Sequence, residues 1–409
     1  RDHPCLALWC GNNEDLGALT WFPASRQNRD RYVVDYDRLN EGTIGRTLDE
    51  CDPTHPFWPS SPSGGRGDYS DNWHSDGRGD MHFWSVWHEG KPFEAYRGVR
   101  PRFCSEFGYQ SFPSLATIRG YAAEEDLNVT SPVLEHHQRN PRGNSLITEM
   151  FTRLFRFPEG FPNFVYLSQV QQALAIKTAV EYWRSLRPHC MGALYWQLND
   201  LWPVCSWSSL EYGGRWKLLH YAARRFFAPT LLLCYRTEAG LDVWAVNDQR
   251  EPVKAKARVS FMSFGGKELK GDSIPLSIPA GKSVLVRRYR SDALPADDQA
   301  FVRLTLKEGN RVSTNELFLA EPKRCALARA LVQAEVVSDG QGLSVVVSSD
   351  APAFYVTLET EGIEGEFEDN GFSLVPGERR SLAFHPRQPT TAAQLRRALG
   401  VRHLRDTYS

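Results

Sequence analysis

The second half of the chain alternates hydrophobic and polar residues in short runs, separated by Gly, Pro and Asp turns. A first set follows Pro229 and includes LDVWAVN, KARVSFMSF and SVLVRRY. A second set begins near Ala326 and includes GLSVVVSS and AFYVTLE. A period of two is typical of half-buried strands, so the pattern predicts two immunoglobulin-like β-sandwich domains, over residues 229–322 and 323–409. Residues 391–409 are polar and basic, and we expect them to form a tail or a short docking helix.

Residues 1–228 have a different pattern, in which short apolar segments lie between helical stretches. The clearest helix is expected over 164–187, where apolar residues recur at helical spacing before Pro188 ends the run. A last helix is expected over 216–227. Short apolar strands are expected at 5–10, 57–61, 81–87, 102–107 and 190–196. The fold class is therefore α/β in the first half and all-β in the second.

Two of these strands deliver an isolated glutamate at their C-terminal ends. LALWCGNNE ends in Glu14, and FCSEFG contains Glu106. A single glutamate after a strand is usually a solvated loop residue, but here Asn12 and Asn13 precede Glu14, and Ser105 and Phe107 flank Glu106. Glycoside hydrolysis needs two carboxylates, one to protonate the leaving oxygen and one to attack the anomeric carbon or activate water. The two glutamates are therefore candidates for the two halves of a sugar-cleaving site.

The segments WCGNNE and SEFG resemble the acid/base and nucleophile signatures of glycoside hydrolase family 2, and they are closest to its β-mannosidases. Further segments agree with this resemblance and occur in the family's order. They are FWPSSPSGG at 57–65, GDMHFWSVWHEG at 79–90, ALYWQLNDLWPVCSWSSLEYGGRWKLLHYAARRFFAP at 193–229 and NGFSLVPGE at 370–378. The resemblance covers nearly the whole chain and is most specific up to residue 229.

The resemblance implies that residues 1–228 are the C-terminal part of a catalytic (β/α)8 TIM barrel, with the five strands as its fourth to eighth. Such a barrel needs about 250 residues and eight strands, so three strands would come from elsewhere. We therefore expect the N-terminal half of the same protein as a partner. An open piece of parallel barrel exposes sheet edges and a hydrophobic interior, so residues 1–409 alone should be neither stable nor active.

The resemblance also implies the chemistry of the site. The whole protein would be a retaining exo-β-mannosidase that removes terminal non-reducing β-D-mannose residues from oligosaccharides, with Glu106 as the nucleophile and Glu14 as the acid/base. Asn13 would bond the sugar 2-hydroxyl. The indoles of Trp84, Trp87 and Trp196 would either wall the sugar subsite or pack at the barrel rim. Further expected hydroxyl partners are His82, Asn199, Asp200 and Asp80.

Other activities and classes stay open at the level of sequence. Sugar identity depends on residues from the three other strands, so an exo-β-glucosaminidase or a β-galactosidase is the alternative enzyme. A chain that binds carbohydrate or packs against another chain without catalysis is the alternative of a different class.

The composition argues against several kinds of partner. Charge is nearly balanced, with 48 basic and 49 acidic residues, which argues against a nucleic-acid partner. No stretch of eighteen apolar residues predicts a membrane span. The 8 cysteines form no CxxC pair, and the histidines lack ligand spacing, so we expect no metal and no cofactor. No feature chooses among periplasmic, secreted, lysosomal and cytoplasmic locations.

Overall fold

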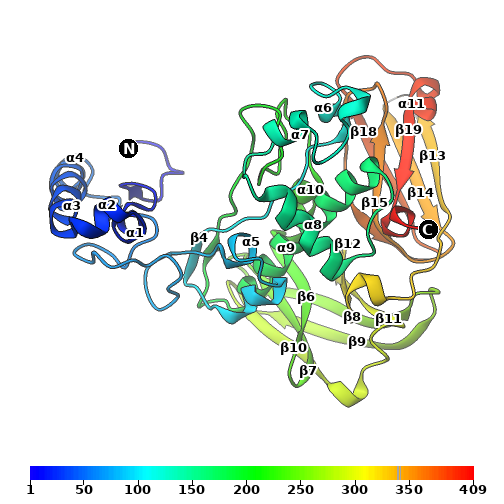
Figure 1. The fold of residues 1–409 in the computed structure, drawn as a ribbon. Helices are drawn as coiled ribbons and strands as arrows, with labels where there is room; N and C mark the ends of the chain where they lie inside the picture. The colour runs from blue at the N-terminus through cyan, green and yellow to red at the C-terminus, as the bar shows by residue number, and fades with distance from the viewer. Residues whose placement is uncertain (339, 341) are drawn as a thin grey trace. The chain divides into compact units, whose positions relative to one another are not determined.

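The computed structural model describes residues 1–338, 340 and 342–409 (Figure 1). Contacts within the chain divide it into two compact units. The first unit comprises Arg1–Gly108 and Tyr182–Trp196, and the second comprises Tyr109–Glu181 and Gln197–Ser409. The long helix α9, Phe161–Ser185, runs across this division.

The first unit holds short parallel strands at the five places where the sequence predicts strands. Strand β1 pairs with β2, while β4 lies between β3 and β5, and every pairing is parallel. The register of β3 and β4 sets His82 opposite Glu106. Parallel neighbours end at the same edge, which brings the residues at their C-terminal ends together. The bounds are β1 Trp9–Cys10, β2 Phe57–Trp58, β3 Met81–His82, β4 Phe103–Glu106 and β5 Gly192–Ala193.

These strands are shorter than the predicted segments, and most of the first unit is helix and loop. Leu16, Leu19 and Tyr36 form a small buried cluster among the helices that follow β1. The prediction that these strands are the fourth to eighth of a barrel stays a prediction. The helices of this part are α1 Asp15–Trp21, α2 Pro23–Gln27, α3 Arg29–Tyr36, a π-helix Asp37–Gly45, α4 Arg46–Cys51 and α5 Ser85–His88.

The two predicted helices are confirmed. Helix α9 begins three residues before the expected 164 and ends at Ser185, two residues before the expected 187. Ala173, Ile176 and Val180, which recur at helical spacing, are buried. The last predicted helix is α10, Leu218–Phe226. The second unit also contains α6 Leu115–Ile118, α7 Pro132–His136 and α8 Gly143–Leu154.

Two antiparallel sheets follow α10, as the alternation after Pro229 predicts. One has the order β10-β7-β6 and the other β12-β11-β8-β9. Residues from both sheets, including Val243, Ala245, Phe261 and Val302, share one buried apolar cluster. The strands are β6 Thr230–Thr237, β7 Gly240–Asn247, β8 Val253–Ser263, β9 Glu268–Ile278, β10 Ser283–Arg290, β11 Ala300–Glu308 and β12 Arg311–Phe318.

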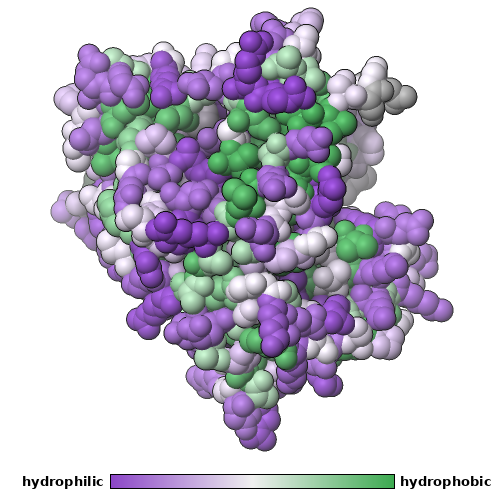
Figure 2. All heavy atoms as spheres, turned by 90° about the vertical axis from the view of Figure 1, so that its right-hand side faces the viewer, coloured by the Kyte–Doolittle hydropathy of each residue, from purple (hydrophilic) through white to green (hydrophobic). Residues whose placement is uncertain are grey.

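A second pair of sheets has the orders β13-β14-β18-β16 and β17-β15-β19. Val345, Val356 and Leu374 belong to the buried cluster between them. On the face drawn in Figure 2, hydrophilic side chains cover most of the surface and apolar ones gather in smaller patches. The strands are β13 Val332–Ser338, β14 Leu343–Ser349, β15 Ala353–Thr360, β16 Gly365–Phe367, β17 Phe372–Leu374, β18 Arg379–Pro386 and β19 Leu399–Arg402.

Of the two expectations for residues 391–409, the short helix is confirmed and the polar tail is wrong. Residues 391–409 begin with helix α11, Ala392–Ala398, which starts at a capping box formed by Thr391 and Gln394. Strand β19 then pairs antiparallel with β15, so the end of the chain completes a sheet. The domain boundaries at 228/229 and 322/323 stay predictions. Within the residues described, no helix combines the length and apolar character needed to cross a membrane.

Candidate active site

Glu14 is held in a strained backbone conformation four residues after the end of β1, at the start of α1. Its φ of 62° and ψ of 14° lie in the left-handed region, which residues with a Cβ rarely adopt. The Glu14 amide donates to Ser61 O at 2.8 Å, which ties the end of β1 to the segment after β2. Gly11 makes this approach feasible, because a Cβ there would lie 2.3 Å from Pro59 O. Strain of this kind persists where surrounding contacts enforce it, and it is common at functional sites.

The two asparagines before Glu14 have different roles. Asn12 is used by the fold: its amide donates to Asn40 Oδ1 at 3.0 Å and to Pro59 O at 2.9 Å, and its oxygen accepts from Ser60 Oγ at 2.7 Å. Asn13 is exposed, and its backbone bridges to Ser61. Its side chain is therefore accessible to a ligand, which keeps the sugar contact predicted for Asn13 open.

Glu106 is the last residue of β4, the central strand of its sheet. Its neighbours are tightly packed: Cys104 and Phe107 are fully buried. Gly108 is required at the end of this segment, because a Cβ there would lie 2.5 Å from Trp196 O and 2.9 Å from the Trp84 ring. The glycines in both signature segments thus serve close packing beside the carboxylates.

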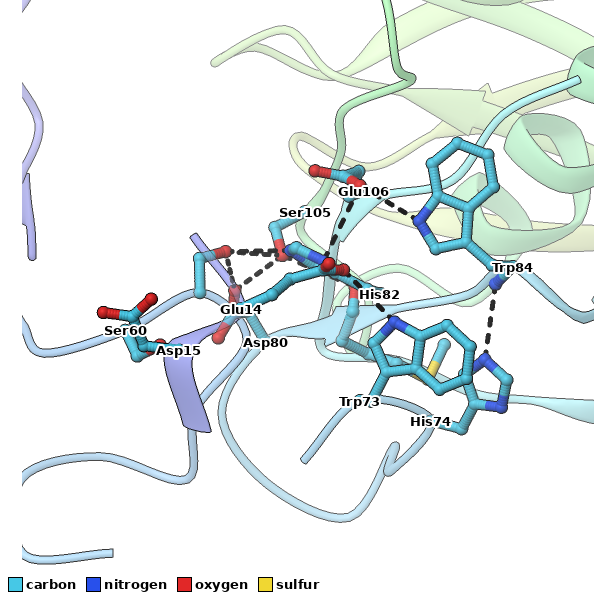
Figure 3. Close-up of polar contacts among 12 residues, drawn as sticks. Glu14, Asp15, Ser60, Trp73, His74, Asp80, His82, Trp84, Ser105 and Glu106 are labelled. Carbon is cyan, nitrogen blue, oxygen red and sulfur yellow. Dashed lines mark hydrogen bonds and ion pairs between the residues drawn. The ribbon is translucent and has the colours of Figure 1, made fainter. Parts of the chain in front are cut away.

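The structure brings the two glutamates together around His82 (Figure 3). A carboxylate oxygen of Glu14, one of Glu106 and a ring nitrogen of His82 all lie within 4.8 Å of one another. His82 Nδ1 is 2.6 Å from Glu14 Oε1 and 3.8 Å from Glu106 Oε1. The imidazole is almost wholly buried, at 1% exposed, while the two carboxylates are partly open to solvent. A single imidazole ring therefore interacts with both carboxylates.

Each carboxylate also accepts a hydrogen bond from an indole. Trp73 Nε1 donates to Glu14 Oε1 at 3.2 Å, and Trp84 Nε1 donates to Glu106 Oε1 at 3.0 Å. His74 stacks on the Trp73 ring, with centroids 3.9 Å apart and planes within 13°. The two indoles therefore orient the carboxylates, since hydrogen bonds to an ionised acceptor are the stronger ones.

Asp80 organises the base of the site. Its Oδ1 accepts from Trp58 Nε1 and from the Ser63 amide, both at 2.9 Å. Its Oδ2 accepts from Ser61 Oγ at 2.6 Å and from Ser105 Oγ at 2.5 Å. The side chain is buried and its oxygens are occupied by protein donors. Asp80 therefore supports the site, and the hydroxyl contact expected of it is taken by two serines.

Burial raises the pKa of the Glu106 carboxyl above its usual range, because the charged form loses water there. The positive charge available on His82 acts in the opposite direction, and the negative charge of Glu14 adds to the rise. The hydrogen bond from Trp84 lowers the pKa again. The ionisation of Glu106 is thus set by a balance in which His82 is the largest favourable contribution.

Glu14, His82 and Glu106 are also the three residues here whose atom types could hold a metal ion. The fit is poor, because atoms bound to one zinc ion lie about 2.0–2.2 Å from it, and a spread of up to 4.8 Å is too wide for neighbouring ligands. The indole N–H groups of Trp73 and Trp84 also point at the carboxylate oxygens that would face the ion. This spacing and these indole donors do not fit a zinc ion.

The other predicted sugar contacts divide into three groups. Trp84 is 5% exposed and holds Glu106, while Trp87 is fully buried, so Trp87 has no ring face available for a sugar. Trp196 is 45% exposed and is compatible with stacking on a ligand. Asn199 and Asp200 belong to the second unit. There Asp200 is buried and accepts from Ser206 Oγ and Ser208 Oγ, both at 2.6 Å.

Sequence reasoning missed three residues of this site. Trp73 lies in the Gly- and Asp-rich loop after β2, where an isolated tryptophan among polar residues was the available signal. Ser61 and Ser105 lie within the predicted strands 57–61 and 102–107 but have no distinctive spacing. Their hydroxyls matter because Asp80 lies between them, and this arrangement follows from strand register.

Comparisons with known proteins identify relatives across the whole chain. The family described as a mannosidase Ig/CBM-like domain matches residues 239–324, and a mannosidase-associated family described as an Ig-fold domain matches residues 327–407. β-Mannosidase of Capra hircus is 33% identical, across 100% of this chain and 50% of that protein. β-Mannosidase B of Thermothelomyces thermophilus is 26% identical, across 92% of this chain and 49% of that protein.

Solved structures give the same result. The crystal structure of β-D-mannosidase from Dictyoglomus thermophilum matches with a TM-score of 0.87 and 30% identity, over 98% of this chain and 48% of that one. An exo-chitosanase of Amycolatopsis orientalis matches with a TM-score of 0.66 but only 16% identity, which shows a shared fold alone. The chain therefore belongs to the β-mannosidases of glycoside hydrolase family 2, and it spans about half the length of the relatives it matches.

Proposed function

We propose that the intact protein is a retaining exo-β-mannosidase, which removes terminal non-reducing β-D-mannose residues through a covalent glycosyl-enzyme. The observation that carries this proposal is the separation of the two acids, whose nearest ligand-type oxygens lie within 4.8 Å of each other. Retaining glycosidases hold their carboxyl groups about 5–5.5 Å apart, whereas inverting ones leave about 6.5–9.5 Å for a water molecule. The narrow gap supports double displacement.

In this mechanism Glu106 attacks the anomeric carbon as Glu14 protonates the leaving oxygen. Glu14 then removes a proton from water, which releases the sugar with its original configuration. The roles rest on the resemblance of WCGNNE and SEFG to the family signatures. The raised pKa of Glu106 by itself would also suit an acid, so the order of the signatures decides between the two roles.

Closure of the site depends on a partner, which we propose is the N-terminal half of the same protein. Strand β1 pairs only with β2, and β5 only with β4, among the residues that the structure describes. Near these strands Leu8, Met191 and Leu194 are about half exposed, at 47%, 55% and 57%. Three further barrel strands would cover such edges and apolar side chains. The chain would then be the C-terminal part of a (β/α)8 barrel with two sandwiches.

The test is a panel of nitrophenyl glycosides on the intact protein, with the product anomer read by proton NMR during the first minutes. We expect hydrolysis of the β-mannoside with β-mannose as the first product. Preference for a β-glucosaminide or β-galactoside would replace the sugar assignment but keep the mechanism. Release of α-mannose would overturn retention, and no turnover of any glycoside would favour a binding or packing role.

A further inference from the structure

His82 occupies a position that a sugar-binding residue would not need. Its ring is 1% exposed, so little of it can touch a ligand. Four polar groups surround it from neighbouring elements: Glu14 after β1, Ser61 after β2 with Asp80 behind it, and Glu106 at the end of β4. These contacts determine where the protons of the ring lie.

The hydroxyl of Ser61 fixes the state of His82 Nε2. The Ser61 hydroxyl has one proton, and it donates this proton to the Asp80 carboxylate at 2.6 Å. Ser61 Oγ can then only accept from His82 Nε2, which lies 3.1 Å away. The hydrogen-bond network therefore assigns a proton to Nε2, and this assignment does not depend on whether Nδ1 is protonated.

The 2.6 Å contact between His82 Nδ1 and Glu14 Oε1 also requires a proton. When Glu14 is ionised, an Nδ1 without a proton would direct its lone pair at a negative oxygen. When Glu14 acts as the acid, its single proton must point at the leaving oxygen. This proton therefore cannot also form the hydrogen bond between Glu14 and Nδ1. In both states the proton belongs to Nδ1, and with Nε2 already protonated the ring is an imidazolium.

At every stage of the retaining mechanism the two glutamates together carry one negative charge, which matches the positive charge of the imidazolium. Before reaction Glu14 is neutral and Glu106 is ionised. In the glycosyl-enzyme Glu106 is an uncharged ester, and Glu14 is ionised because it has given its proton to the leaving group. One negative charge is thus conserved, and it moves from a group 3.8 Å from Nδ1 to a group 2.6 Å from it.

We propose that His82 remains an imidazolium throughout the reaction and is the fixed counter-ion of this one charge, held in that state by Ser61 and Asp80. The inference rests on the proposed function, because it uses the retaining cycle. His82 is then a positioning residue that acts through the two glutamates. Its shorter contact with Glu14 favours the movement of charge that accompanies formation of the glycosyl-enzyme.

The decisive experiment replaces His82 by a neutral amide in the intact protein. His82→Gln retains hydrogen bonding but cannot carry charge. Loss of the cation removes the largest contribution that favours ionised Glu106. The acidic limb of kcat/KM against pH, which reports ionisation of the nucleophile in the free enzyme, should move up by about one pH unit or more. An unmoved limb would mean that His82 is neutral and would overturn the proposal.

His74→Gln is the matched control for removal of a histidine. His74 stacks on Trp73 and is hydrogen-bonded to the Trp84 amide and the Ser85 hydroxyl, so its loss should leave the acidic limb where it is. An equal shift in both variants would attribute the effect to disturbed packing and contradict the charge assignment.

A second pair of variants decides the question if His82→Gln does not fold. Ser61 and Ser105 both donate to Asp80 Oδ2, but of the two only Ser61 is hydrogen-bonded to His82 among the described residues. Ser61→Ala should move the acidic limb in the same direction as His82→Gln, by a smaller amount, and Ser105→Ala should not move it. Equal behaviour of the two would contradict the fixed ring state.

Failure of this inference can be told from failure of the proposed function. Wild-type protein is assayed first on nitrophenyl β-mannoside. No turnover there would remove the proposed function, whereas wild-type turnover with an unmoved limb in His82→Gln removes the counter-ion alone.

Discussion

The first unit and the two sandwiches hold their chains in place by different means. In the first unit the strands are two to four residues long, and the site is positioned by side-chain hydrogen bonds such as those that converge on Asp80. In the sandwiches many strands run for seven to eleven residues, and continuous ladders enclose apolar clusters. The candidate catalytic residues thus lie where the regular backbone pairing is shortest.

This difference follows from what each region must hold. A ladder fixes backbone and lets alternate side chains face a core, which suits packing. A catalytic pair needs two carboxyl groups held close together although their charged forms repel each other, and this requires donors from several elements. Glu14 is accordingly held by a strained backbone, an indole and an imidazole, which come from separate segments. Substitutions in the first unit should therefore change activity, and those in the sandwiches stability.

The strongest test of this contrast is removal of the proposed nucleophile. Glu106→Ala in the intact protein should lower kcat by roughly 10⁵- to 10⁶-fold, because no covalent intermediate can form. The melting temperature should change little, since Glu106 is partly open to solvent. Azide should restore some turnover and give the inverted product, an α-mannosyl azide identified by NMR. A retained product would show that another group attacks.

The next largest effect is expected at Glu14 and depends on the leaving group. Glu14→Ala should slow substrates with poor leaving groups by about 10²- to 10⁴-fold, because these need protonation. Dinitrophenyl mannoside, whose leaving group is already a weak base, should lose much less. The ratio of the two rates is the measurement. If Glu106→Ala showed this selectivity and Glu14→Ala gave the inverted mannosyl azide, the roles would be reversed.

A core substitution in the second sandwich should show the opposite profile. Leu374 in β17 is fully buried in the apolar cluster of that sandwich. Leu374→Ala should lower the free energy of unfolding of this region by about 2–5 kcal/mol, through lost apolar contacts and a residual cavity. Urea unfolding followed by tryptophan fluorescence measures the loss. Below the transition, kcat/KM should equal the wild-type value, and a pH profile that also moved would contradict the separation of the two regions.

The sequence was sufficient for the features that repeat. Helix α9 is long and periodic, and the sandwich strands alternate over many residues, so both patterns have many positions that agree. The proximity of Glu14 and Glu106 could be predicted because their segments resemble the two signatures of one site, although β1 and β4 lie in separate sheets. Strand β19 has four residues and no alternation, and its pairing with β15 depends on distant contacts.

The supporting residues of the site could not be predicted in the same way. Tryptophan suits both a buried core and a sugar platform, so composition could not separate Trp87, which is buried, from Trp196, which is 45% exposed. The direction of the Ser61 hydroxyl follows from the position of Asp80 beside it. That position results from the register of short strands and from loop conformation, which leave no periodic pattern in the sequence.

The smallest expected effects come from a matched pair of buried aspartates, one in each region. Asp80 is 9% exposed and accepts from neutral donors at the base of the site, while Asp242 in β7 is 3% exposed and pairs with Arg288 through two contacts of 2.6 Å. Replacing either by Asn should cost about 1–3 kcal/mol of stability. Asp242→Asn should lie at the low end, since the Arg288 side chain is 52% exposed and screened by water.

Activity should separate the two variants. The amide nitrogen introduced by Asp80→Asn would face the Ser61 and Ser105 hydroxyls or the Trp58 and Ser63 donors, so at least one group must turn away. A rotated Ser61 would release His82 and lower kcat/KM, by about 10-fold if one charge-assisted contact near the carboxylates is lost. Asp242→Asn should keep the wild-type kcat/KM. Equal activity losses, measured at matched fractions of folded protein, would mean that stability alone links both aspartates to turnover.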